Sequence, residues 1–228
     1  MRGIREGAVA EGIGTFALCF IGAGAICTNQ WSGGALGLLG IAIAHGTVLA
    51  VMISALGHIS GGHFNPAVTL GVLTANKIDG RRSLVYILAQ LVGAVAAGYL
   101  LRFIVPEQAW QPVHLGTPGL SVGVTVVQGV LVETILTCFL VLAVCGTAVD
   151  PQGSWNAVAG FGIGTVLIFD ILVGGPITGA AMNPARAFGP AVASGYWDFH
   201  LIYWLGPITG GVLAAFLYSS IFLERKQR

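Results

Sequence analysis

Residues 58–71 read HISGGHFNPAVTLG and residues 176–189 read PITGAAMNPARAFG, so the tripeptide Asn-Pro-Ala occurs twice in the chain. Each tripeptide reads as a helix start, because asparagine caps helices and proline is favoured at the first helical position, where its missing N–H would have no partner. Both copies lie in Gly-rich apolar sequence. A chain break at membrane depth is tolerated only where the freed backbone groups are buried in protein or line a watery cavity. The two copies therefore predict a pore or a binding site within a membrane.

The composition also indicates an integral membrane protein. Of the 228 residues, 55% are hydrophobic and only 8% are charged, and the net charge of +1 gives no reason to expect a nucleic-acid partner. Four cysteines lie in apolar segments without the spacing of metal ligands, so we expect neither a disulfide nor a metal, and no cofactor. They are Cys19, Cys27, Cys138 and Cys145.

Six stretches approach or exceed the roughly 20 apolar residues that a membrane helix needs. They are residues 6–27, 35–56, 83–105, 122–147, 156–173 and 199–222. Two further apolar pieces, 65–75 and 183–194, have about half the crossing length. The predicted fold is therefore an all-α membrane protein with six transmembrane helices and two re-entrant half-helices.

The two halves of the chain resemble each other, since Glu11 and Glu133 occupy equivalent places in the first and fourth spans. We interpret the chain as one transmembrane channel domain, 1–228, with repeats 1–118 and 119–228. Three spans per repeat is an odd number, so the second repeat is inverted, an arrangement that places a site near the midplane.

The positive charges predict the orientation of the chain. Eight of its ten Lys and Arg residues fall on one side of this topology, which the positive-inside rule makes cytoplasmic, with both termini. They are Arg2, Arg5, Lys77, Arg81, Arg82, Arg225, Lys226 and Arg228. No targeting signal is evident, so we expect the plasma (cell inner) membrane.

The segments HISGGHFNPAVTLG and ITGAAMNPARAFGP resemble the signature segments of the aquaporin, or major intrinsic protein, family. The resemblance covers nearly the whole chain. It implies a passive channel for water and small uncharged solutes in the lipid bilayer, with one pore in each subunit of a homotetramer and no catalytic residues. The pore residues it implies are Asn65, Pro66, Ala67, Asn183, Pro184 and Ala185.

The paired motifs have a physical role in such a pore. Each Asn side chain directs an N–H donor inward, and each half-helix N-terminus adds partial positive charge. A passing water molecule turns its oxygen toward the centre, which breaks the hydrogen-bonded chain along which a proton would move, and the positive ends oppose cations.

Arg186 lies three residues after Asn183, about one helical turn further. An arginine within the membrane is costly unless it faces water or a partner. The family resemblance assigns it to a selectivity constriction, whose other members by offset are His45, Ile171 and Ala180. Proximity to Arg186 and a low dielectric both disfavour a protonated His45, so we expect a neutral imidazole that donates to water or accepts from ammonia. The alternative is a buried histidine bonded to a neighbouring backbone group.

This constriction differs from that of strict water channels. Those channels resemble one another in having Phe, His and often Cys at the positions of His45, Ile171 and Ala180. Ile171 and Ala180 should widen the passage and make one wall apolar. The set resembles the plant tonoplast-type aquaporins and the animal branch that conducts ammonia and hydrogen peroxide.

Further polar residues accompany the two motifs. Glu11 and Glu133 would be costly if unpaired, so we expect them to accept from backbone N–H groups of the re-entrant loops. His58 and His63 are expected to hold the first loop in shape, without forming a metal site.

Two residues keep alternative interpretations. His114 is either a surface histidine or an extra donor above the constriction, as in ammonia-permeable relatives. Asp170 either braces the loop before Asn183 or changes the charge balance near Arg186.

Several other functions are open at this point. A strict water channel and a glycerol facilitator are the alternatives within the family, although Ala187 stands where glycerol channels carry an acidic residue. A secondary transporter shares the inverted repeat and the broken helices. An intramembrane enzyme lacks the expected motifs, and Arg186 argues against a purely structural membrane protein.

Overall fold

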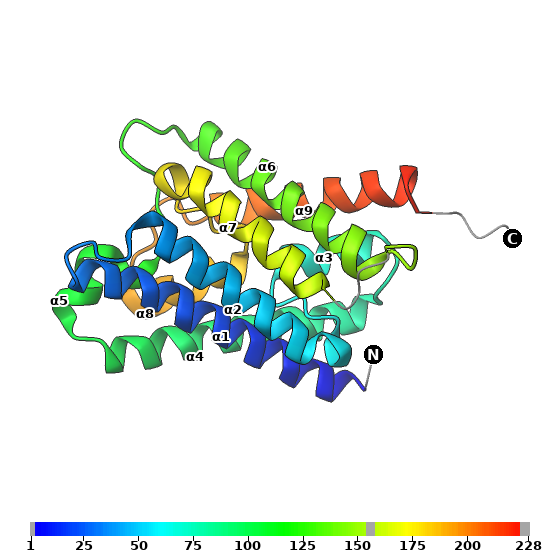
Figure 1. The fold of residues 1–228 in the computed structure, drawn as a ribbon, viewed down its shortest axis with the longest axis horizontal. Coiled ribbons are helices and arrows are strands. Elements are labelled where there is room, and N and C mark those ends of the chain that lie inside the picture. Colours follow the sequence, from blue (N-terminus) through cyan, green and yellow to red (C-terminus); the bar gives the residue numbers. More distant parts are fainter. Residues whose placement is uncertain (1–2, 154–157, 224–228) are drawn as a thin grey trace, which may run out of the picture.

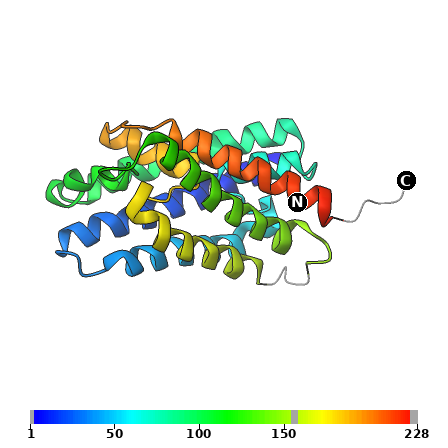
Figure 2. The same ribbon diagram turned by 90° about the horizontal axis from the view of Figure 1, so that it is seen from above.

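The computed structural model describes residues 3–153 and 158–223, which form a bundle of helices that run roughly along one direction (Figures 1 and 2). In chain order they are α1 (Ile4–Trp31), α2 (Gly37–Ser60), α3 (Pro66–Thr74), α4 (Gly80–Ile104), α5 (Glu107–Trp110), the 3₁₀ helix η1 (Gln111–Gly116), α6 (Val126–Val144), the π-helix η2 (Cys145–Val149), α7 (Ala159–Thr178), α8 (Pro184–Ser194) and α9 (Ile202–Ile221). The first residues of the predicted fifth span, 156–157, and four of the basic residues lie outside the described residues; the four are Arg2, Arg225, Lys226 and Arg228.

Six of these helices are long and apolar enough to cross a membrane: α1, α2, α4, α6 with η2, α7 and α9. They correspond to the six predicted spans, and the protein is an integral membrane protein. The largest shift at a helix start is in α6, which begins at Val126 rather than near residue 122. A capping box causes it, because the Thr125 hydroxyl accepts from the Gln128 N–H while the Gln128 side chain accepts from the Thr125 N–H.

The half-helices α3 and α8 begin at the prolines of the two motifs, as predicted. Asn65 caps α3, and its Oδ1 accepts from the N–H of Ala67 at 2.8 Å. Asn183 caps α8, and its Oδ1 accepts from the N–H groups of Ala185 and Arg186 at 3.0 and 3.2 Å. Both side chains are therefore fixed by the helices that they start.

Small residues bring the spans into close contact, and α2 and α7 show this best. A Cβ on Gly46 would collide with the Gly164 carbonyl, and a Cβ on Gly164 would collide with the Gly46 carbonyl. This reciprocal contact is what a two-fold relation between the two helices requires. It agrees with the inverted repeat.

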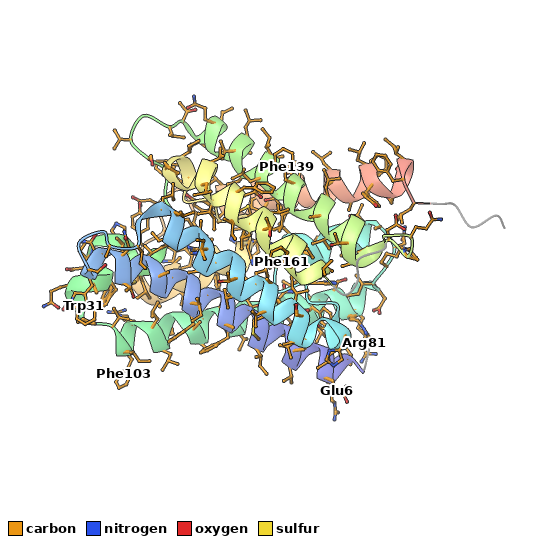
Figure 3. The ribbon with its side chains drawn as sticks, in the orientation of Figure 1. Glu6, Trp31, Arg81, Phe103, Phe139 and Phe161 are labelled. Carbon is orange, nitrogen blue, oxygen red and sulfur yellow. The ribbon has the colours of Figure 1, made fainter. Side chains whose placement is uncertain are left out.

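The surface of the bundle separates apolar from charged side chains. Phe103, Phe139 and Phe161 are exposed on the spans α4, α6 and α7. Glu6 and Arg81 lie at one end of the bundle (Figure 3). The start of α1 and the end of α9 lie at this same end, which we call the terminal side (Figure 1). The other end, which carries α5 and η1, is the opposite side.

Candidate pore and selectivity constriction

Glu11 on α1 is fully buried and holds the first re-entrant loop. Its Oε1 accepts from the Ser60 hydroxyl at 2.6 Å and from the His63 N–H at 2.9 Å. Its Oε2 accepts from the Phe64 N–H at 2.6 Å and from the Gln90 amide at 2.7 Å. Loop N–H groups at membrane depth need such an acceptor, because no water is present to replace it.

Glu133 on α6 makes the corresponding bonds to the second loop. Its Oε1 accepts from the Thr178 hydroxyl at 2.6 Å and from the Ala181 N–H at 3.0 Å, and its Oε2 accepts from the Met182 N–H at 2.7 Å. Both glutamates thus bond to the backbone groups that the sequence led us to expect. The side-chain donors that complete these sites were not foreseen.

The two loops are also joined directly to each other. The Nδ2 group of Asn65 donates to the Met182 carbonyl at 2.8 Å, and the Nδ2 group of Asn183 donates to the Phe64 carbonyl at 2.9 Å. An amide nitrogen carries two hydrogens, so each asparagine keeps one for a further acceptor.

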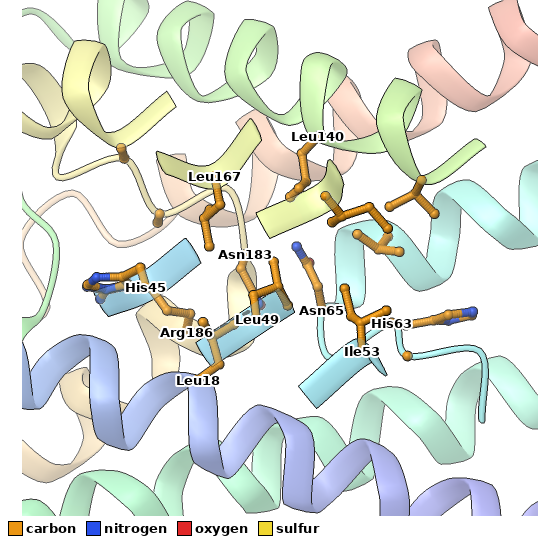
Figure 4. Close-up of a pocket in the computed structure, with 16 residues that line it drawn as sticks. Leu18, His45, Leu49, Ile53, His63, Asn65, Leu140, Leu167, Asn183 and Arg186 are labelled. Atoms are coloured by element: carbon orange, nitrogen blue, oxygen red, sulfur yellow. Dashed lines mark hydrogen bonds between the residues drawn. The ribbon is translucent and has the colours of Figure 1, made fainter. Parts of the chain in front are cut away.

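A cavity passes along both asparagines. Figure 4 shows His45 and Arg186 toward one end of this row of side chains, Asn65 and Asn183 in the middle, and His63 toward the other end. Because α2 runs toward the terminal side, His63 lies on the terminal side and His45 on the opposite side. The structure thus brings the predicted motif residues into one passage.

Arg186 is buried and held by two acceptors. Its Nη1 group donates to the Gly116 carbonyl at 2.8 Å, and its Nη2 group lies 3.1 Å from Nε2 of His45. Nδ1 of the same ring lies 2.9 Å from the Ile41 carbonyl. A guanidinium only donates and a carbonyl only accepts, so these partners assign a neutral imidazole with its proton on Nδ1.

This geometry corrects the expected role of His45. The neutral form agrees with the expectation, but Nδ1 and Nε2 are both engaged within the protein. Neither ring nitrogen is left to donate to water or to accept from ammonia. Gly22 of α1, where any Cβ would collide with the imidazole ring, also belongs to this site and was not foreseen.

Ile171 and Ala180, which we expect to form the apolar part of the constriction, are both buried. Ala180 lines the inner cavity, whereas Ile171 lines a wider vestibule on the opposite side. His45 and Arg186 line both spaces, so they mark the boundary between the cavity and the vestibule.

His114 lies in the vestibule but makes no hydrogen bond to Arg186 within the described part of the chain. Its ring stacks on that of Tyr196, with 3.9 Å between centroids and 3° between planes. The bond from this segment to Arg186 comes instead from the carbonyl of Gly116, two residues later. Backbone carbonyls carry no sequence signature, so this acceptor could not be predicted.

The structure departs from two other expectations. The His58 side chain is exposed and has no hydrogen bond to the described residues, and Ser60 is the residue that bonds to Glu11. Asp170 does not brace the second loop, because neither of its buried carboxyl oxygens has a partner among the described residues. His63 does bond locally, with Nδ1 lying 3.1 Å from the Thr69 hydroxyl.

The described residues contain no group of three or more His, Cys, Asp and Glu that could hold a metal ion. The passage has two amide donors at the centre and a fixed guanidinium on the opposite side. These groups can orient and select small polar molecules.

Comparisons with known proteins agree with this architecture. Residues 3–218 match the family model described as major intrinsic protein. Aquaporin TIP4-4 of Zea mays is 44% identical over 225 residues, covering 95% of this chain and 86% of that protein. Aquaporin-8 of Mus musculus is 41% identical over 221 residues, covering 96% and 83%.

Among solved structures, the aquaglyceroporin from Plasmodium falciparum aligns with a TM-score of 0.84. The alignment covers 96% of this chain and 97% of that one, at 22% identity, and so shows a shared fold. From the family match and the close relatives, the chain belongs to the major intrinsic protein family and is an aquaporin-family channel for water and small solutes.

Proposed function

We propose that this channel passes ammonia and hydrogen peroxide together with water, down their gradients. The observation that carries the proposal is the chemical asymmetry of the constriction. Arg186 supplies the charge and the fixed donors, whereas Ile171 and Ala180 are apolar and buried. At a less polar wall an uncharged molecule loses far less hydration than an ion does, and Arg186 opposes cations.

In this proposal His45 acts through Arg186. Its Nε2 accepts from the guanidinium, and Gly116 accepts on the other side, so the charge is held in one orientation. A solute passing this point meets the remaining guanidinium N–H groups on one side and hydrocarbon on the other. Fixed donors of this kind require no rearrangement as each molecule passes.

At the centre, Asn65 and Asn183 each offer one N–H to a solute oxygen or nitrogen. The N-termini of α3 and α8 add partial positive charge from opposite directions. We propose that these groups orient each water molecule with its oxygen toward the centre and its hydrogens outward on both sides. This orientation interrupts proton transfer along the pore. Glu11 and Glu133 serve only to position the loops.

The assembly and location follow from the family resemblance and the surface. We propose a homotetramer of single channel domains, each with repeats 1–118 and 119–228. We propose that the terminal side is cytoplasmic, since Arg5 and Arg81 lie in the described part of that side. The plasma membrane is the proposed location, and the tonoplast is the alternative that the TIP relatives favour.

The experiment is a pair of fluxes measured on the same proteoliposomes. Ammonia entry is followed with an internal pH dye, and osmotic water flow is followed by light scattering. Both fluxes are expected to exceed those of empty vesicles, without saturation and without dependence on proton or sodium gradients. Water flow alone would support the strict water channel and contradict the proposed solute range. Saturable, gradient-coupled flux would support the secondary transporter.

A further inference from the structure

The inverted repeat assigns every constriction residue a counterpart in the other half of the chain. Asn65 and Asn183 are 118 residues apart. The same offset relates the loop residues that bond to the two glutamates, such as Phe64 and Met182. It also relates Gly46 and Gly164, whose contact is reciprocal. The offset therefore holds along α2 and α7, the loops and the start of the half-helices.

Applied to the constriction, this offset identifies a second set of side chains. The counterparts of Arg186, His45, Ile171 and Ala180 are Val68, Ile163, Ile53 and Gly62. All four line the same internal cavity as Asn65 and Asn183. They lie on the terminal side of these asparagines, because α3 extends from the centre in that direction and α7 begins there.

The space around this second set is also filled differently. Glu11 and Glu133 are 122 residues apart, and the same offset relates Gly22 to Val144. Gly22 leaves room for the ring of His45, whereas Val144 lines the cavity. We call Ile53, Val68, Val144 and Ile163 the apolar ring. Each of its members is buried, with at most 8% of its surface exposed.

The polar side chain of His63 also lines the cavity on the terminal side, and its neighbour Thr69 determines which ring nitrogen carries the proton. The Thr69 hydroxyl donates to the Asn65 carbonyl at 2.9 Å and accepts from the Gln90 amide at 3.0 Å. Nδ1 of His63, 3.1 Å from this hydroxyl, is therefore a donor. In the neutral ring Nε2 is then an acceptor, and His63 lines the cavity. The counterpart of His63 on the opposite side is Ala181.

We propose that the apolar ring is a second specificity-determining site of the channel, on the terminal side. It supplies no donor or acceptor of its own, so a passing molecule gives up hydrogen bonds that the ring does not replace. The loss grows with the number of polar groups on the solute. The ring therefore favours small molecules with few hydrogen bonds over larger polar solutes such as urea, independently of Arg186.

This inference rests on the proposed channel function, and its test separates the two. Val68→Thr keeps the shape of the side chain and adds one hydroxyl to the ring. Val72→Thr is the matched control, because Val72 lies about one turn further on α3, is equally buried and does not line the cavity. Urea and water fluxes are measured on the same proteoliposomes, and their ratio is compared with that of the wild type.

Because urea loses more hydrogen bonds at the ring than water does, the ring limits urea flux more than water flux. We expect Val68→Thr to raise the ratio of urea to water flux by up to about fivefold, the effect of one regained hydrogen bond on a barrier. Val72→Thr should leave it unchanged. Ile163→Thr tests the same ring from α7 and is expected to act in the same direction if Val68→Thr fails to fold. An unchanged ratio in the folded ring variants, with wild-type water flux present, would overturn the apolar ring alone. Wild-type vesicles no more permeable to water than empty ones would overturn the channel function as well.

Discussion

The two re-entrant loops are held in the same way, but the passages on either side of them are lined differently. Glu11 and Glu133 each accept a hydroxyl and two backbone N–H groups from their loops. Beyond the loops, however, Arg186 on the opposite side has Val68 as its counterpart on the terminal side. One end of the pore is charged and the other is apolar.

The difference shows which positions the physics of the membrane constrains. Buried N–H groups must be bonded whatever the channel carries, so both halves need the same carboxylate. Side chains that face the lumen contact water and solute instead. They can differ between halves without leaving backbone groups unpaired, and the two ends of one pore can therefore select by different means.

The largest expected effect comes from removing a loop anchor. Glu133→Ala leaves the N–H groups of Ala181 and Met182 buried without an acceptor, at a cost of about 1–3 kcal/mol each. We expect a large fall in the melting temperature of the purified protein in detergent and loss of water flux. Glu11→Ala should have a comparable effect, if the two loops are equivalent.

Glu6→Ala is the control for both anchors, since Glu6 is exposed at the start of α1. Its melting temperature should match that of the wild type. If Glu133→Ala changed neither the melting temperature nor the water flux, the loop bonds would not be what holds the pore open.

A second prediction concerns the charged end. Arg186→Val makes the opposite side resemble the terminal side and removes a charge worth about 4 kcal/mol to a cation 4 Å away, at an effective dielectric constant of 20. We expect cation leak into proteoliposomes to rise at least about tenfold. Arg186→Lys keeps the charge and should leak less than Arg186→Val. Equal leak in both variants would mean that the charge is not the barrier.

A third prediction concerns the apolar wall of the constriction. Ile171→His adds a polar ring opposite Arg186 and narrows the passage, so ammonia flux should fall relative to water flux by about fivefold, the effect of one changed hydrogen bond. Ile171→Leu, of equal volume and still apolar, should keep the wild-type ratio. The pH-dye and light-scattering assays measure both fluxes. An unchanged ratio of ammonia to water flux in Ile171→His would show that this wall does not determine the choice between the two solutes.

The smallest effect should come from a support that, among the described residues, only the second loop has. The Tyr203 hydroxyl donates to the Thr178 carbonyl at 2.7 Å, whereas Gln90 reinforces the first loop through Glu11. Tyr203→Phe should lower the free energy of unfolding by about 1 kcal/mol, with water flux retained. Tyr99→Phe, on the exposed face of α4, is the control and should have no effect. A loss of water flux in Tyr203→Phe would instead give the hydroxyl a role in the pore.

Much of the fold could be predicted from local sequence. Runs of apolar residues mark the six spans, and an asparagine before a proline marks the start of each half-helix. The conformation of the segment at 107–116 could not, because its short helices, α5 and η1, have neither the length nor the periodicity of a span. The shifted start of α6 depended on a side-chain cap at Thr125.

The sequence by itself determined the membrane fold, the duplicated half-helices and the residue types available to the pore, because hydrophobic length and helix capping act over a few neighbouring residues. Only the tertiary structure decided the partners. Arg186 bonds to a carbonyl at Gly116 and to His45, residues far from it in the chain. The tertiary structure also places Val68 and Ile163 in the lining of one cavity. Such contacts depend on how distant helices pack, which no local pattern records.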